Sequence, residues 1–304
     1  HYILNNYHTY YHRSTFLPSN YSYNLQSKIN NMDNMAYIDV FCSFLFSELT
    51  QKDILPNFPI YYGSINGKRD IKYDITEEFY EFEDHPEFIK MNQKTFEIDC
   101  YSNDSESDNS RTKSRTNSSV SSESSNGDIY IAKLKDCPSI LLFMEKLEGT
   151  LEDIIQDDLC IDELKSCFFQ IAFSLAYLQK HYAFTHNDLH INNIMYSVTD
   201  KTFIYYKFNN IYYKVPTFGK IFKIIDFGRS IITYKKKLFL NDAFSKFGEA
   251  EGQYQYSSSV PFMPIKQGTE PSPYFDLCRL AITMLDEIRY NYDVEIDETD
   301  VEDL

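Results

Sequence analysis

Apolar residues recur at intervals of three and four in three segments of the chain, and this spacing predicts three helices. The first segment is 35–53, where the recurring positions are Tyr37, Phe41, Phe44, Leu45 and Glu48. The second is 161–181, which Asp162 can cap and whose apolar stripe is Leu164, Cys167, Phe168, Ile171, Leu175 and Leu178. The third, 274–288, is apolar enough to be a core helix.

Short apolar runs between these helices predict strands. One is Ile60 to Ile65, which follows Pro56, and another is the buried run at 139–144, which leads through a polar link into a further helix at about 151. Segment 203–215 reads as two strands turned by Asn209 and Asn210. A last apolar strand at 221–225 ends at Asp226.

Residues 102–127 contain Ser, Asn and charged side chains and almost nothing apolar, so we expect a disordered insertion there. Residues 1–34 show weak periodicity and give no assignment. A helix and strands therefore precede a mostly helical half that carries polar loops. This order predicts an α+β fold of two lobes.

Composition narrows the class of protein. The chain has 304 residues and a formal net charge of -16, so its surface as a whole would repel phosphate backbones, and we expect no nucleic-acid partner. The six cysteines have no C-x-x-C pair or disulfide spacing, which favours reduced thiols in a cytoplasmic compartment. No run approaches the ~20 apolar residues of a membrane helix, and the oligomeric state is left open. Because the sequence starts at His1, we expect it to be a fragment, cut at one or both ends.

Three polar side chains suit phosphoryl transfer, which needs a carboxylate to orient the attacking hydroxyl and oxygen ligands for Mg²⁺. Asp188 and Asn193 lie on one polar loop between the short apolar runs Ala183–Thr185 and Ile194–Tyr196. Asp226 lies on a second loop, at the end of an apolar strand. Oxygen atoms from two loops can meet over one metal ion.

The polar loop HNDLHINN, residues 186–193, resembles the catalytic loop H-x-D-L-x-x-x-N of protein kinases, and DFG at 226–228 resembles their magnesium loop. The two motifs occur in the same order as in that family, with a helix before them and strands between them. The resemblance extends from about Met35 to Ile288. It is strongest to the divergent serine/threonine kinases of large (giant) DNA viruses, because of the long strand pair between the two loops. A viral protein would then act in the host cytoplasm or in the virion.

The resemblance implies a two-lobed protein-kinase-like fold with a small β-rich N-lobe and a larger helical C-lobe. The N-lobe would be 1–143, incomplete at its start, the hinge 144–150, and the C-lobe 151–304. Asp188 would be the catalytic base, and Asn193 and Asp226 would hold Mg²⁺. His186 would brace the loop, and Asp276 would hold it through backbone hydrogen bonds.

The resemblance also implies an ATP site. Met144 would lie beside the adenine, and backbone groups from Glu145 to Leu147 would hydrogen-bond the base. Lys28 is the one lysine upstream of the 35–53 helix, so it is the default contact for the α- and β-phosphates. Its acidic partner on that helix is Asp39 or Glu48; the two are nine residues apart and therefore lie on opposite helix faces, so one of them faces the cleft.

The sequence departs from the kinase pattern in several places, of which three bear directly on ATP and phosphate contacts. The first glycine is Gly63, so the glycine loop that clamps ATP is missing from this sequence; it lies upstream, or ATP binding is poor. Asn187 replaces an arginine that binds an activating phosphate, which predicts activity without that phosphorylation. His190 replaces the lysine that contacts the transferred phosphate, which predicts a pH-sensitive contact.

Three functions are compatible with these residues. The first is an ATP- and Mg²⁺-dependent kinase whose substrates are Ser/Thr hydroxyls of proteins. The second is a small-molecule kinase of the choline or aminoglycoside kinase type, whose loop also has histidine at the position of His190; Phe227 and Gly228 favour the protein kinase. The third is a pseudokinase that binds partners without catalysis, favoured by the missing glycine loop.

Overall fold

A computed structural model describes residues 28–93, 96–101, 128–157, 160–244, 250 and 272–292. The chain is a mixed α+β protein with a β-rich part and a helical part, as the sequence predicts. It divides into two compact units, one of His1–Asn31 with Ile65–Leu141 and one of Met32–Ser64 with Leu142–Leu304. The predicted disordered insertion, residues 102–127, lies outside the described residues. No helix in the described part of the chain is both long and apolar enough to cross a membrane.

The first unit is built on a three-stranded sheet in the order β1-β3-β2. The strands are β1 (Tyr61–Asp74), β2 (Phe96–Tyr101) and β3 (Ile129–Met144), and β2 pairs antiparallel to β3 with Phe96 opposite Leu134. The short helices α3 (Phe79–Phe82) and α4 (Pro86–Met91) follow β1. A small core forms between the helices and the sheet and contains Ile75, Phe88, Phe96 and Ala132.

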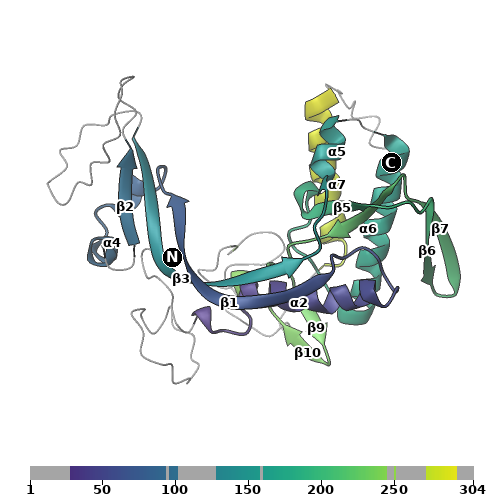
Figure 1. Cartoon of the computed structure of the whole chain (residues 1–304), viewed down its shortest axis with the longest axis horizontal. Coiled ribbons are helices and arrows are strands. Elements are labelled where there is room, and N and C mark those ends of the chain that lie inside the picture. Colours follow the sequence, from purple (N-terminus) through teal and green to yellow (C-terminus); the bar gives the residue numbers. More distant parts are fainter. Residues whose placement is uncertain are drawn as a thin grey trace. The chain divides into compact units, whose positions relative to one another are not determined.

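The second unit contains the longer helices, α2 (Met35–Gln51), α5 (Leu151–Asp157), α6 (Ile161–Tyr182) and α7 (Phe275–Tyr292). In Figure 1, α5 lies alongside α7. One continuous core joins α2, α5, α6 and α7 with the strands that precede the polar loops. Phe46 of α2 lies at its centre, with its ring centroid 5.1 Å from those of Phe184 and Phe227. The aromatic core therefore lies directly beside both predicted loops.

The strands of the second unit carry these loops. One sheet has the order β4-β5-β8 and consists of β4 (Gly149–Thr150), β5 (Ile194–Val198) and β8 (Lys220–Ile224). The antiparallel pair β5 and β8 places Ile194 opposite Ile224, so the chain just before β5 and the chain just after β8 meet at one end of the sheet. Two further antiparallel pairs are β6 (Phe203–Phe208) with β7 (Ile211–Pro216), and β9 (Ile232–Tyr234) with β10 (Lys237–Phe239).

All three predicted helices are present, but their details differ from the prediction. Asp162 does not cap α6: the N-cap residue is Cys160, which makes no side-chain cap bond, and Asp162 lies in the first turn, 3.0 Å from Lys165. On α2 the buried face is Ile38, Cys42, Leu45, Phe46 and Leu49, whereas Phe44 is 48% exposed. The predicted stripe was therefore only partly right, because Leu45 is in the core and Phe41 packs against it, whereas Phe44 faces outward.

The hairpin prediction is confirmed. Asn209 and Asn210 both have positive φ, as a two-residue turn of the type favoured in hairpins requires, and Phe208 is opposite Ile211. The strand at 60–65 is longer than predicted, since β1 continues to Asp74. The strand at 139–144 is the end of the 16-residue β3, and it is not buried: Leu141 and Phe143 are about half exposed.

Candidate active site

The predicted catalytic loop is fixed at both ends by backbone pairing. Thr185, just before it, exchanges two backbone hydrogen bonds of 3.0 and 2.9 Å with Ile231. At its other end a single turn of 3-10 helix, Ile191–Asn193, leads directly into β5. The loop therefore starts and ends on strand-like segments, and its polar residues are held between two apolar anchors.

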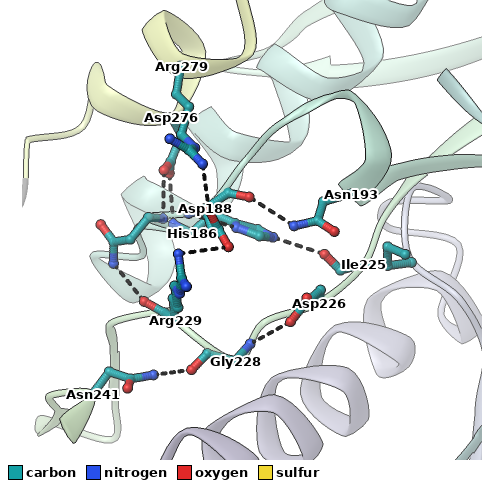
Figure 2. A network of polar contacts seen from close by, with 11 residues as sticks. His186, Asp188, Asn193, Ile225, Asp226, Gly228, Arg229, Asn241, Asp276 and Arg279 are labelled. Carbon is teal, nitrogen blue, oxygen red and sulfur yellow. Dashed lines mark hydrogen bonds and ion pairs between the residues drawn. The ribbon is translucent and has the colours of Figure 1, made fainter. Parts of the chain in front are cut away.

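Asp276 of α7 holds the start of this loop, as the sequence predicts. Its two carboxylate oxygens accept the backbone N–H groups of His186 and Asn187, each at 2.8 Å (Figure 2). Asp276 is completely buried, and this burial raises the pKa of its carboxyl group, against the effect of the two N–H donors. The two hydrogen bonds offset part of the cost of burying the charge.

His186 connects the two predicted loops. Its Nε2 lies 3.0 Å from the carbonyl oxygen of Ile225, which can only accept, so Nε2 carries the proton. Its Nδ1 then accepts the backbone N–H of Asp188 at 3.3 Å. The ring is completely buried and packs against Phe227, with centroids 5.6 Å apart. His186 is therefore a brace, in agreement with the interpretation from sequence.

Asn193 lies beside Ile225, the residue that precedes Asp226. The Ile225 N–H donates to the carbonyl of Asn193 at 3.0 Å, and the Asn193 side-chain Nδ2 donates to the carbonyl of Asp188 at 2.9 Å. Asp226 has φ of +62°, a left-handed conformation that few non-glycine residues adopt and that is enriched at functional sites. The Gly228 N–H donates to Asp226 Oδ1 at 3.2 Å, and a Cβ on Gly228 would come within 3.2 Å of that same oxygen, so glycine permits this close approach.

The donor set at these loops fits a magnesium ion. Because Nδ2 of Asn193 is used in the bond to Asp188, Oδ1 is the amide atom that can act as a metal ligand. Asp226 supplies carboxylate oxygens from the second loop. Mg²⁺ typically uses one or two protein oxygens and completes its shell with water and substrate phosphates. Among the described residues, no group of three or more His, Cys, Asp or Glu side chains gathers as a metal site.

The carboxylate of Asp188 lies between two arginines, which the sequence analysis did not identify. Arg279 Nη2 lies 2.8 Å from Oδ1, and Arg229 Nη1 lies 3.2 Å from Oδ2 (Figure 2). His190, two residues beyond Asp188, has its pKa lowered by burial and by the nearby charge of Arg279, although Asp188 acts in the opposite direction. At neutral pH the positive charge beside Asp188 therefore comes from the arginines and not from His190.

Of the two acidic residues on α2, Asp39 is the one that contacts the predicted magnesium loop. Its Oδ1 accepts the backbone N–H of Phe227 at 2.9 Å. Glu48 instead forms a surface ion pair of 2.7 Å with Lys52, one turn later. The pKa of Asp39 is raised from 3.8 to about 6, mainly by burial and also by the charge of Asp226, against the effect of the Phe227 hydrogen bond.

Replacing Asp39 with asparagine is expected to change how stability depends on pH. Because the folded pKa of Asp39 is raised to about 6 from 3.8, the folded state binds the proton more tightly than the unfolded state, and stability falls as pH rises through this window. Asp39→Asn removes that loss, so relative to the parent it should gain about 3 kcal/mol between about pH 4 and pH 7. Denaturant unfolding across this pH range, without nucleotide or magnesium, measures the gain.

Glu48→Gln is the matched control on the same helix. It breaks an exposed i,i+4 pair and should change stability by less than about 0.5 kcal/mol at every pH. Parallel pH profiles for Asp39→Asn and the parent would contradict the raised pKa.

The segment after Gly228 is held by two asparagine side chains. Nδ2 of Asn187 donates to the carbonyl of Arg229 at 2.9 Å. Nδ2 of Asn241 donates to the carbonyl of Gly228, and the Ala243 N–H donates to Asn241 Oδ1 at 2.9 Å. Asn187 itself has φ of +66°, which asparagine tolerates better than most residues. The neutral amide of Asn187 therefore connects the loop at 186–193 to the segment that follows Gly228.

Glu145, in the predicted hinge, is anchored by a buried lysine. Its Oε2 lies 2.9 Å from Nζ of Lys223 in β8 and accepts the Ile60 N–H at 3.0 Å. Lys223 Nζ also donates to the carbonyl of Phe58 at 3.1 Å. The Glu145 backbone N–H donates to the carbonyl of Ile60 at 2.8 Å. Of the two backbone groups of Glu145, the carbonyl is therefore the one that stays a predicted contact for adenine.

The other residues predicted to contact ATP are Met144, Leu147 and Lys28. Met144 and Leu147, on either side of Glu145, are half-buried. Lys28 is 5% exposed and belongs to the first compact unit, whereas Asp39 belongs to the second. Their roles stay predictions.

Comparison with known proteins gives two partial similarities, and no family model matches the chain. Over 123 residues, 36% of this chain, it is 34% identical to a protein of Dictyostelium discoideum named as a probable serine/threonine-protein kinase. Over 75 residues, 23% of this chain, it is 43% identical to a protein of Acanthamoeba polyphaga mimivirus that is also named as a serine/threonine-protein kinase. The matches span 10% and 19% of the lengths of these relatives. A part of this chain is thus kinase-like in sequence.

Proposed function

We propose that this protein is an ATP-dependent kinase that phosphorylates Ser/Thr hydroxyls of proteins. The observation that carries the proposal is the junction of the two predicted loops: Asn193 and Ile225 share a backbone hydrogen bond of 3.0 Å, and His186 bonds the Ile225 carbonyl at 3.0 Å. This junction places the motif that contains Asp188 and Asn193 beside the residue that precedes Asp226. The two relatives named as serine/threonine kinases support the same reaction class.

In the proposed reaction Asp188 orients the attacking hydroxyl and accepts its proton, which a carboxylate in hydrogen-bond reach can do. Asn193 Oδ1 and the Asp226 carboxylate would hold Mg²⁺, which when bound neutralises charge on the phosphates. Asp39 supports Asp226 indirectly, because it fixes the backbone of the next residue, Phe227. His190, neutral at pH 7, would donate a hydrogen bond to the transferred phosphate rather than a charge.

The proposed nucleotide site uses residues further from this junction. The adenine would lie beside Met144 and bond the carbonyl of Glu145 and the backbone of Leu147, and the Glu145–Lys223 ion pair would keep this segment in place. Lys28 would contact the α- and β-phosphates. Residues 1–143 would then form the N-lobe, 144–150 the hinge and 151–304 the C-lobe of a two-lobed kinase fold.

The test is a transfer assay with the full-length protein, γ-labelled ATP and Mg²⁺. The acceptors, in parallel reactions, are casein, choline and kanamycin, and Asp226→Asn serves as the inactive reference. We expect label on casein serine and threonine and none on the small molecules. Label on choline or kanamycin would support the small-molecule kinase instead. ATP binding with no labelled acceptor would support the binding module.

A further inference from the structure

The side chain of Asp188 is held by two arginines that come from different parts of the second unit. Arg279 projects from α7, and Arg229 directly follows Gly228. Figure 2 shows both guanidinium groups reaching the same carboxylate, one at each oxygen. Asp188 is only 16% exposed, so solvent screens these contacts less than it would on an open surface.

Helix α7 holds the loop twice. Asp276 and Arg279 are three residues apart and therefore share one helix face. Asp276 fixes the main chain of His186 and Asn187, while Arg279 fixes the side chain of the next residue, Asp188. A rigid helix thus sets both the position of the loop and the direction of its carboxylate.

The two arginine contacts differ in strength. The 2.8 Å between Arg279 Nη2 and Oδ1 is within the range of charge-assisted hydrogen bonds, whereas the 3.2 Å between Arg229 Nη1 and Oδ2 is longer. The arginine that makes the short contact belongs to a helix, and the other belongs to a loop segment. Arg279 therefore anchors Oδ1, whereas Oδ2 can exchange its weaker contact with Arg229 for a hydrogen bond from another donor.

We propose that Arg279 is a positioning residue for phosphoryl transfer, which anchors Oδ1 of Asp188 so that Oδ2 receives the proton of the substrate hydroxyl. This inference rests on the proposed kinase function. In the step, the hydroxyl oxygen bonds to the γ-phosphorus of ATP, the bond from that phosphorus to the β,γ-bridging oxygen breaks, and ADP leaves. The hydroxyl proton passes to Oδ2 and then to solvent.

Arg279→Met and Arg279→Lys test the role in the same transfer assay. Arg279→Met loses the anchor, and a misdirected base is expected to lower kcat by about 10- to 100-fold while KM for ATP stays within about twofold. Arg279→Lys keeps one charged donor and should recover part of the loss. The matched control is Arg289→Met on the exposed side of the same helix, which should retain the parent kcat.

Chemical rescue distinguishes a positioning role of Arg279 from a purely structural role, because added guanidinium can replace the missing side-chain group but cannot repair a disturbed fold. Guanidinium chloride, kept well below denaturing concentrations, should raise the kcat of Arg279→Ala and leave that of Asp188→Asn unchanged. A parent-like kcat for Arg279→Met, a change in KM alone, or no rescue would overturn the inference. If the parent protein itself transfers no phosphate to any acceptor, the proposed function fails and the inference fails with it; an active parent with an unaffected Arg279→Met overturns the inference alone.

Discussion

Asp188→Asn is expected to lower kcat for phosphoryl transfer to protein by about 10²- to 10⁴-fold, the usual contribution of a positioned general base. The change is nearly isosteric, and the asparagine oxygen can still accept from Arg279, but the amide nitrogen then faces Arg229, so this contact is lost together with the group that takes the proton. KM for ATP should change little, because Asp188 is not among the groups proposed to hold the nucleotide. Initial rates at saturating ATP measure the effect.

The control is Asp200→Asn, the same chemical change at an exposed turn between β5 and β6, which should leave kcat unchanged. Unfolding of Asp188→Asn should show a loss of about 1–3 kcal/mol, the size of one hydrogen bond to a charged group. Two results would contradict the role of Asp188: a parent-like kcat, or an activity loss that follows a collapse of the fold.

Much of the site was predictable from sequence because its polar residues lie on short loops between strongly apolar segments. The loops at 186–193 and 226–228 are recognisable as local patterns, and their strands β5 and β8 are adjacent in the sheet. The role of Asp276 was predicted from the kinase resemblance, and Asp276 lies in the first turn of α7. In each case the chemistry and the element that carries it are close together in the chain.

The residues that sequence missed act over long separations. Arg279 and Asp188 are 91 residues apart, and Lys223 and Glu145 are 78 apart, so no local pattern reports either pair. One signal was present for Arg279, its position three residues after Asp276 on the same helix face. Lys223 gave no such signal, because a lysine in a short strand is usually exposed.

The choice between Asp39 and Glu48 shows a different limit. Both lie on α2, and helical geometry places them on opposite faces without saying which face meets the loops. Aromatic residues at Phe41, Phe44 and Phe46 make more than one face apolar. Tertiary packing alone determines which of the two acids meets the magnesium loop: Phe46 enters the core, and Asp39 accepts the Phe227 N–H.

Asp276→Asn is expected to lower both stability and catalysis. Asparagine presents one oxygen and one NH₂ where the parent presents two oxygens, so one of the His186 and Asn187 N–H groups faces another donor. Losing one charge-assisted bond and leaving a buried N–H without an acceptor should cost about 2–4 kcal/mol, after the gain from no longer burying a charge. Because these N–H groups position the loop, kcat should fall at least about tenfold. Chemical denaturation and the transfer assay measure the two effects.

Asp286→Asn supplies the comparison, because it makes the same change on the exposed face of α7 and should alter stability by less than about 0.5 kcal/mol. Asp276→Ala separates the contributions further: it removes the mismatched NH₂ but leaves both N–H groups without their partner, so it should be at least as destabilising as Asp276→Asn. A stable Asp276→Ala with parent-like kcat would mean that backbone pairing at Thr185 and Ile231 suffices to hold the loop, and that α7 is not its anchor.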